Sequence, residues 1–386
     1  MALSSAPDES SAQPETARRS TGSTSNSTSA NGNVPIIAST LETLGEVARD
    51  PRVDDRAQAR MAAVQETLTV DLAWLAGTLA DACEKGPSPA REAASHLVAA
   101  GGKRVRPMAT LLSAAAANGL SGDKVARART VAVAAELIHS ATLLHDDVID
   151  DSRERRGRET SRVVWGNGVS VLAGDLLLVH ALEIVQPLEG VGGRILVDLL
   201  ATLRRMVEGE VVQLRGRASL DLSEITYERV VQGKTAALFA WACRSGARAA
   251  HGDERVAAAL GAYGGHVGVA FQIVDDLIDL VGDPRQTGKA LLADVKEGKP
   301  TLPLLRAIAR DASLLGRVRT LREGEGDEAL AADIARAIVA SGACDEVRAR
   351  AAAESSRALS ALEGVPKGAA RDALAQVAED LAARVA

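Results

Sequence analysis

The chain has 386 residues, of which 46% are hydrophobic, so it can bury a substantial core in one large domain or in two. Acidic residues outnumber basic ones by 51 to 45, the formal net charge is −6, and aromatic residues make up only 2%. This balance argues against a nucleic-acid binder, because such proteins normally present a basic face and stacking aromatic side chains.

The first 33 residues are mostly Ser, Thr, Ala and Asn. They lack the large apolar side chains that offset the entropy cost of ordering, so we expect a disordered tail. Residues 34–386 instead repeat apolar side chains at helical spacing, with glycine-containing breaks such as Gly190–Gly193 and Gly216. We therefore predict one all-α domain over residues 34–386, a large single-domain helical bundle around a central cavity.

The cysteine pattern and the apolar runs bear on location. Cys83, Cys243 and Cys344 are widely separated and form no CxxC pair, which suits a reducing cytoplasm. No run of eighteen consecutive apolar residues occurs, so we expect no transmembrane segment. The sequence predicts a cytoplasmic protein.

The segment GGKRVRP, residues 101–107, places Lys103 and Arg106 three residues apart where Pro107 can begin a helix. Cationic side chains at a helix N-terminus favour phosphate binding. A solvated basic loop would give the same pattern, so this segment alone does not define a site.

The most informative segment is LLHDDVIDDS, residues 143–152, which follows an apolar helical run. Aspartates four residues apart stack on one helix face and repel each other by about 0.2–0.5 kcal/mol per pair. They also lie near the expected helix C-terminus, where the backbone dipole disfavours negative charge. Folding alone does not favour this cluster, so a positive partner is expected. His139 lies two turns before Asp146, and it is either a phosphate contact or a buried structural histidine.

A second acidic cluster occurs in FQIVDDLIDLVGD, residues 271–283, again after an apolar run. If both helices belong to one bundle, the two carboxylate sets can face each other across a cavity. Hard oxygen ligands of this kind suit Mg²⁺, which shares its coordination shell with waters and phosphate oxygens. Basic residues accompany both clusters, namely Arg155, Arg156, Lys234, Lys289 and Lys299. Together they predict a diphosphate site.

These motifs resemble those of the all-trans isoprenyl diphosphate synthases, or polyprenyl synthetases. The resemblance covers residues 99–305 through GGKRVRP, LLHDDVIDDSRERRG, GDLLL, GKTAALF, FQIVDDLID and GKPTLPLL, in the family's order. It implies an all-α bundle, a homodimer, and Mg²⁺-dependent condensation of isopentenyl diphosphate with an allylic diphosphate. No nucleic acid is implied as a partner.

The resemblance also implies a role for each matched position. The aspartates would hold Mg²⁺ on two sides of the allylic diphosphate: Asp146, Asp147, Asp150, Asp275, Asp276 and Asp279. The other allylic-side residues would be Arg155, Lys234, Thr235, Gln272, Lys289 and Lys299. The metal-free isopentenyl diphosphate would be bound by Lys103, Arg106, His139 and Arg156. The residues expected to act directly in the ionisation are Asp146, Asp147, Asp150, Lys234, Thr235, Gln272 and Asp275.

Product length depends on the helix that precedes the first aspartates. Ala141 and Thr142 lie about one turn below the metal site, and both are small. Since bulky side chains there give short products in the family, we expect a medium or long polyprenyl chain suited to a quinone. A deeper residue such as Ile138 could instead stop growth, and a C20 geranylgeranyl diphosphate synthase is the alternative.

Two rival functions remain. A class I terpene cyclase also ionises an allylic diphosphate in a helical cavity, but it typically has a different second metal motif and does not need GGKRVRP. A non-catalytic subunit of a heteromeric synthase usually has eroded acidic motifs, whereas both clusters are intact here.

Overall fold

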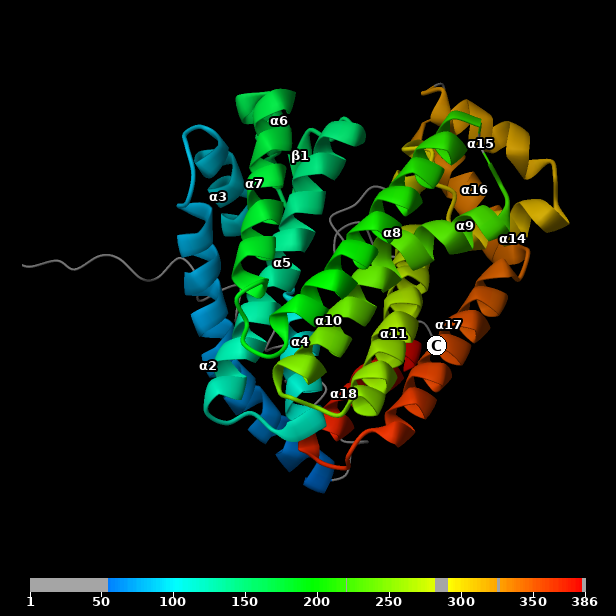
Figure 1. The fold of residues 1–386 in the computed structure, drawn as a ribbon. Coiled ribbons are helices and arrows are strands. Elements are labelled where there is room, and N and C mark those ends of the chain that lie inside the picture. The colour runs from blue at the N-terminus through cyan, green and yellow to red at the C-terminus, as the bar shows by residue number, and fades with distance from the viewer. Residues whose placement is uncertain (1–54, 220, 282–290, 325–326, 384–386) are drawn as a thin grey trace, which may run out of the picture.

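The computed structural model describes residues 55–219, 221–281, 291–324 and 327–383. The expected tail, residues 1–33, lies outside this range, so the predicted division into a tail and one domain stays a prediction. The described residues are almost entirely helical, which confirms the predicted all-α class (Figure 1).

The N-terminal half contains α5, the helix that carries the first acidic cluster. Its elements are α2 (Asp55–Cys83), α3 (Ala90–Ala99), α4 (Val105–Asn118), α5 (Asp123–Ile149), β1 (Glu154–Arg155), β2 (Arg158–Glu159), α6 (Ser161–Trp165), α7 (Asn167–Val185) and α8 (Gly192–Ser219). Strands β1 and β2 pair antiparallel and form a short hairpin directly after α5.

The C-terminal half contains the second acidic cluster and the helices packed around it. Its elements are α9 (Glu224–Val230), the π-helical turn η1 (Val231–Ala236), α10 (Ala237–Ala249), α11 (Glu254–Val281), α13 (Ala293–Lys296), α14 (Leu302–Arg310), α15 (Leu314–Arg322), α16 (Glu328–Ala340), α17 (Ala343–Ala361), the short turn η2 (Leu362–Gly364) and α18 (Ala369–Ala383).

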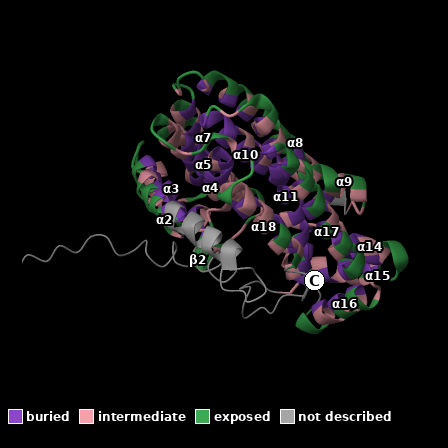
Figure 2. Ribbon diagram, turned by 90° about the horizontal axis from the view of Figure 1, so that it is seen from below, coloured by how far each residue is buried: buried purple, intermediate pink, exposed green. Residues whose placement is uncertain are grey.

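Helix α5 lies in the middle of the bundle, packed against α4, α7 and α10. Residues 131–138 are all buried, which explains why this run is apolar apart from Glu136, whose carboxylate forms an ion pair with Arg104. Glycine permits the closest of these contacts, because a Cβ on Gly174 of α7 would lie 2.3 Å from the His145 ring on α5. Burial is concentrated in these central helices, while the outer faces stay exposed (Figure 2).

Helix α11 joins two hydrophobic clusters, because its N-terminal half packs with α10 and its C-terminal half packs with the helices that follow it. It therefore holds the second acidic cluster at a fixed place relative to α5. The expected break at Gly216 was wrong, since α8 continues to Ser219. One glycine inside a helix costs only about 1 kcal/mol relative to alanine, and packing along the helix can offset that.

Two of the described helices, Asn167–Val185 and the Glu254–Leu280 part of α11, are long and apolar enough to cross a membrane by length and composition alone. Within their most apolar windows, 39% and 56% of the residues are buried in the fold. Length and composition do not distinguish such helices from membrane spans, so the predicted absence of a transmembrane segment stays a prediction.

Candidate active site

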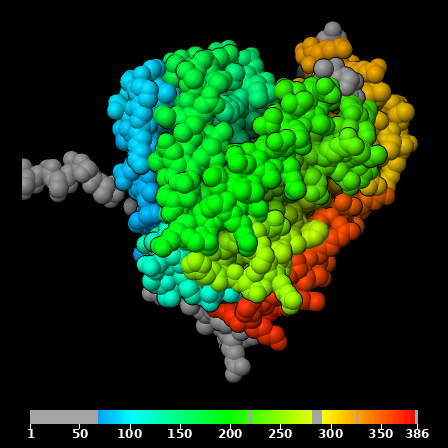
Figure 3. Space-filling view, in the orientation of Figure 1, coloured from blue at the N-terminus to red at the C-terminus, as the bar shows by residue number. Residues whose placement is uncertain are grey.

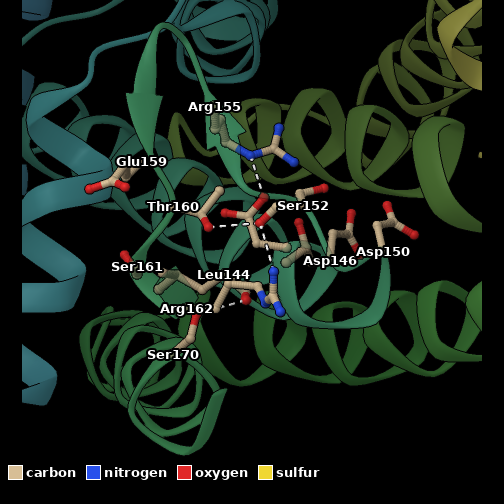
Figure 4. A network of polar contacts seen from close by, with 12 residues as sticks. Leu144, Asp146, Asp150, Ser152, Arg155, Glu159, Thr160, Ser161, Arg162 and Ser170 are labelled. Atoms are coloured by element: carbon tan, nitrogen blue, oxygen red, sulfur yellow. Dashed lines mark hydrogen bonds and ion pairs between the residues drawn. The ribbon is translucent and has the colours of Figure 1, made fainter. Parts of the chain in front are cut away.

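The first acidic cluster occupies the C-terminal turn of α5 and the residues just after it. Asp146 and Asp150 lie side by side, whereas neighbouring Asp147 is fully buried and accepts a 2.7 Å hydrogen bond from Arg155 Nε of β1 (Figure 4). This divergence follows from the helical period, which turns adjacent side chains by about 100°. The fourth aspartate, Asp151, is exposed and forms an ion pair with Arg162 of α6.

The positive partners of this cluster come from three different parts of the chain, and the sequence predicted two of them, Lys234 and Lys299. Lys234 Nζ of η1 lies 3.2 Å from Asp146 Oδ2 and 2.6 Å from Glu210 Oε2 of α8. Lys299 Nζ lies 2.6 Å from Asp150 Oδ2. Arg217, in the last turn of α8, contacts the other oxygen of Asp150.

These contacts and burial shift the pKa values of two carboxyl groups in opposite directions. Burial alone would raise the pKa of Asp150, but the positive charges of Lys299, Lys234 and Arg217 outweigh it and lower the pKa. Burial is also the main influence on Asp147, and there it prevails over Arg155 and raises the pKa of that carboxyl. The two carboxylates therefore differ: Asp150 is held ionised by cations, and Asp147 is shielded from solvent.

The second acidic cluster also separates into different environments. Asp276 is only 3% exposed and accepts hydrogen bonds from the Tyr227 hydroxyl at 2.7 Å, Gln272 Nε2 at 3.0 Å and the Leu302 amide at 3.0 Å. Burial raises its pKa to about 7, although these three donors act in the opposite direction. Asp275, the neighbouring residue, is half-buried at the cavity wall, and Asp279 is buried.

Both clusters line one cavity of about 240 Å³. Its acidic lining includes Asp146, Asp150, Asp275 and Asp276, but neither Asp147 nor Asp279. The basic and polar lining includes Arg155, Lys234, Thr235, Gln272 and Lys299. The molecular surface is hollowed between the α5–α7 side and the α8 side (Figure 3). The predicted meeting of two acidic helix ends is therefore what the structure shows.

The cavity suits a divalent cation shared with an anionic ligand. Among the residues that the structure describes, no three acidic, histidine or cysteine side chains converge as a ready-made metal centre. Cations such as Mg²⁺ do not need one, because they are commonly held by one or two carboxylates together with phosphate oxygens and waters. The carboxylates of Asp146 and Asp150 supply such ligands, and the nearby lysines suit the phosphate oxygens.

The π-helical turn η1 places Lys234 and Thr235 in the cavity. A Cβ on Gly233 would lie 2.7 Å from the carbonyl oxygen of Arg205, so glycine is required where η1 contacts α8 backbone to backbone. Single π-turns within helices are frequent at functional sites. From this turn, Thr235 Oγ1 donates a 3.0 Å hydrogen bond to Gln272 Oε1, which links η1 to the second acidic cluster.

A second basic group lies around His139, two turns before Asp146 on α5. Arg106 is stacked 4.8 Å from the Phe239 ring centroid, and burial lowers its pKa to about 10. Burial also lowers the pKa of His139 well below its usual value, with further contributions from Arg106, Arg156 and their neighbours. The Arg156 guanidinium lies against Gly102, where a Cβ would be 2.8 Å from Nη2.

The structure therefore brings three of the four predicted isopentenyl-side residues together, namely Arg106, His139 and Arg156. Lys103 is exposed beside them, next to Gly102. Lys289, predicted on the allylic side, lies outside the described residues.

Sequence reasoning missed three residues at this site: Glu210, Arg217 and Tyr227. Each contacts a predicted residue through a side chain from a distant part of the chain. No motif marks Arg217, and the tyrosine, one of two in the chain, had only its rarity as a signal.

Comparison with known proteins identifies the class. The Polyprenyl synthetase family model matches residues 88–337, and the chain belongs to this family. The chain is 37% identical over 298 residues to the short chain isoprenyl diphosphate synthase of Methanothermobacter thermautotrophicus, covering 76% of this chain and 90% of the relative. It is also 37% identical over 280 residues to the octaprenyl diphosphate synthase of Escherichia coli, covering 72% of this chain and 85% of the relative.

A solved structure agrees. The polyprenyl synthase from Caulobacter crescentus, complexed with calcium and isoprenyl diphosphate, aligns with a TM-score of 0.76 and 37% sequence identity, over 84% of this chain and 97% of that one. The predicted enzyme class is confirmed: this chain is a trans-prenyltransferase of the all-trans polyprenyl diphosphate synthase type.

Proposed function

We propose that this enzyme uses Mg²⁺ to condense isopentenyl diphosphate with an allylic diphosphate, and that the cavity between α5 and α11 binds the allylic substrate. The observation that carries the proposal is the shared lining, in which Asp146 and Asp150 from α5 and Asp275 from α11 meet around Lys234 and Lys299. Mg²⁺ at these carboxylates would neutralise charge as the diphosphate leaves.

The protein's own residues act around that leaving group. Lys234, Lys299 and Arg155 bind phosphate oxygens and hold the diphosphate in one orientation. Thr235 and Gln272, already hydrogen-bonded to each other, direct dipoles toward the allylic carbon. The carbocation is then attacked by the double bond of isopentenyl diphosphate, and loss of a proton completes the extension by five carbons.

The second basic group binds isopentenyl diphosphate. Arg106 and Arg156 remain cationic, while His139 stays neutral because of burial and the surrounding positive charges. A neutral imidazole can donate one hydrogen bond to a phosphate oxygen without needing a proton from solvent. Exposed Lys103 adds charge at the entrance.

We further propose a product longer than C20. Ala141 is buried and small, and neither it nor half-buried Thr142 projects a bulky side chain below Asp146. The named relatives differ, since one is called short chain and another octaprenyl, so product length requires its own measurement. Extending labelled farnesyl diphosphate and sizing the products decides it. Products beyond C20 support the proposal, whereas a stop at C20 favours the geranylgeranyl alternative.

The reaction itself is tested with the purified chain alone, Mg²⁺ and both substrates. We expect label from isopentenyl diphosphate in the product and its loss with EDTA. No incorporation by the purified chain would contradict the proposal and favour a non-catalytic subunit. A cyclised hydrocarbon would instead indicate a terpene cyclase.

We also propose a homodimer formed through an exposed apolar surface, the α7–α8 face. It consists of Leu172, Val179, Val197, Leu200, Val207 and Val211. Leu172, Val197 and Val207 are 62%, 65% and 63% exposed, and α7 and α8 contact each other. Large exposed apolar patches of this kind mark association surfaces.

Light scattering tests this surface. Val207→Glu should give a monomer, whereas Val339→Glu, at an exposed valine on α16, should not change the mass. A dimer that persists in Val207→Glu, or a monomeric wild type, would contradict the proposal.

We propose a cytoplasmic location, because the three cysteines are free and buried, as suits a reducing compartment.

A further inference from the structure

Asp146 and Asp150 line the cavity at the C-terminal end of α5, and Asp150 is the one that contacts more cations. Its side chain is only 6% exposed, and each of its two oxygens contacts a different cation. Arg217 Nη1 contacts Oδ1, and Lys299 Nζ lies 2.6 Å from Oδ2. A divalent cation that coordinates Asp150 therefore competes with two positive charges that already neutralise this carboxylate, and their repulsion favours displacement of one of them.

The position of Arg217 is supported by a residue from the C-terminal half. Arg322 Nη2 of α15 donates a 2.8 Å hydrogen bond to the carbonyl oxygen of Arg217. The same guanidinium lies against Gly298, where a Cβ would be 2.9 Å from Nη2. One arginine thus contacts both the end of α8 and the segment just before Lys299, the two places from which cations reach Asp150.

The two cations differ in what they can do after leaving Asp150. Lys299 lines the cavity with a single ammonium group, which acts as a point charge. Arg217 carries a planar guanidinium that can bind two phosphate oxygens at once. It comes from α8, opposite the Arg155 hairpin that follows α5 (Figure 1). A guanidinium on that side would hold the diphosphate from a direction that Arg155 does not cover.

We propose that Arg217 is an additional diphosphate-binding residue that exchanges partners during substrate binding. In the substrate-free enzyme it neutralises Asp150. When a divalent cation takes Asp150, the Arg217 guanidinium is released and binds the diphosphate that the same cation holds. This inference rests on the proposed Mg²⁺-dependent function and adds a residue to it.

The exchange predicts two effects of opposite sign for Arg217→Gln. Removing a competing cation from Asp150 should strengthen binding of Mn²⁺ alone by about fivefold, measured from the electron paramagnetic resonance signal of free Mn²⁺. Removing a phosphate ligand should weaken binding of a non-ionising thiolo analogue of farnesyl diphosphate at saturating Mg²⁺ by about tenfold, measured by calorimetry. A loss of local structure would weaken both bindings rather than shift them in opposite directions.

Two further variants serve as controls. Arg217→Lys keeps the charge, so its Mn²⁺ affinity should stay near wild type, while analogue binding falls because the planar fork is lost. Arg319→Gln removes an exposed arginine from α15 and should change neither measurement. Thermal unfolding of every variant shows whether the fold is retained.

The outcomes separate the two proposals. If wild type binds the analogue only with a divalent cation and Arg217→Gln shifts the two affinities in opposite directions, the exchange is supported. Suppose instead that wild type binds the analogue only with a divalent cation, but Arg217→Gln has the wild-type affinities or weaker affinities for both Mn²⁺ and the analogue. The exchange is then overturned, and the proposed function stands. If wild type shows no metal-dependent binding, the proposed function fails and the exchange fails with it.

Discussion

Tyr227 offers the sharpest single perturbation of the second acidic cluster. Its hydroxyl donates a 2.7 Å hydrogen bond to Asp276 Oδ2, which also accepts from the Leu302 amide. Asp276 is 3% exposed, so the Tyr227 hydroxyl is one of three protein donors that take the place of bulk water at this carboxyl. Tyr227→Phe keeps the ring and removes only this bond.

The magnitude follows from the kind of bond removed. A hydrogen bond to a charged group contributes about 1.5–3 kcal/mol, and because the pKa of Asp276 is about 7, Tyr227→Phe should lower the free energy of unfolding by roughly that amount above neutral pH, where the carboxyl is ionised. Two donors remain on Asp276, namely Gln272 and the Leu302 amide, and they keep the loss near the lower end. Because Asp275 precedes Asp276 on α11, a carboxyl that moves should also raise the Mg²⁺ concentration needed for half-maximal activity.

The chain's other tyrosine provides a matched control. Tyr263 is also buried, and its hydroxyl donates to the Leu374 carbonyl at 2.6 Å, in the core and with no cavity residue as partner. Tyr263→Phe should therefore lower stability without changing the Mg²⁺ dependence. Urea unfolding and Mg²⁺ titration of turnover are measured for both variants. Equal Mg²⁺ dependence in the two variants, or no loss of stability in Tyr227→Phe, would refute the reasoning.

Three further substitutions test other parts of the account. Ala141→Phe adds bulk about 7.5 Å along α5 from Asp146 and should shorten the product; an unchanged product size on chromatography would place the limit elsewhere. His139→Gln tests the neutral histidine. Because burial lowers the folded-state pKa of His139, wild type should lose up to about 1.4 kcal/mol of unfolding free energy per pH unit below pH 6.5, and the variant should lose less. If urea unfolding gives the same pH dependence of stability for both proteins from pH 7 to 5, the histidine is not held neutral by burial. Gly233→Ala should reduce turnover at least tenfold by separating η1 from α8, whereas Gly265→Ala, which meets only one atom at 3.9 Å, should not; equal turnover would count against the role of that contact.

Local patterns in the sequence were sufficient for the main features of the fold. The all-round apolar run before Asp146 predicted a buried central helix, and α5 is that helix. Two acidic helix ends predicted a shared cavity, because such charges need a common positive partner. The break expected at Gly216 was wrong because tertiary packing can outweigh the modest helix preference of one residue.

The different environments of the individual site residues could not be predicted from local patterns. The sequence treats all six aspartates alike, yet Asp146 and Asp150 face the cavity while Asp147 contacts Arg155. Arg217 and Tyr227 reach the site only because α8 and α9 cross near the ends of α5 and α11. That crossing depends on long-range packing, which no short motif encodes.

The most direct measurement of the central claim is metal-dependent binding of the thiolo analogue to Asp146→Asn, Asp275→Asn and the double variant, by calorimetry. If both helices hold the same metal-bound diphosphate, each single variant should lose at least about tenfold in affinity, and the double loss should differ from the sum of the two. Wild-type affinity in Asp275→Asn, or strictly additive losses, would show that α5 and α11 do not act on one ligand.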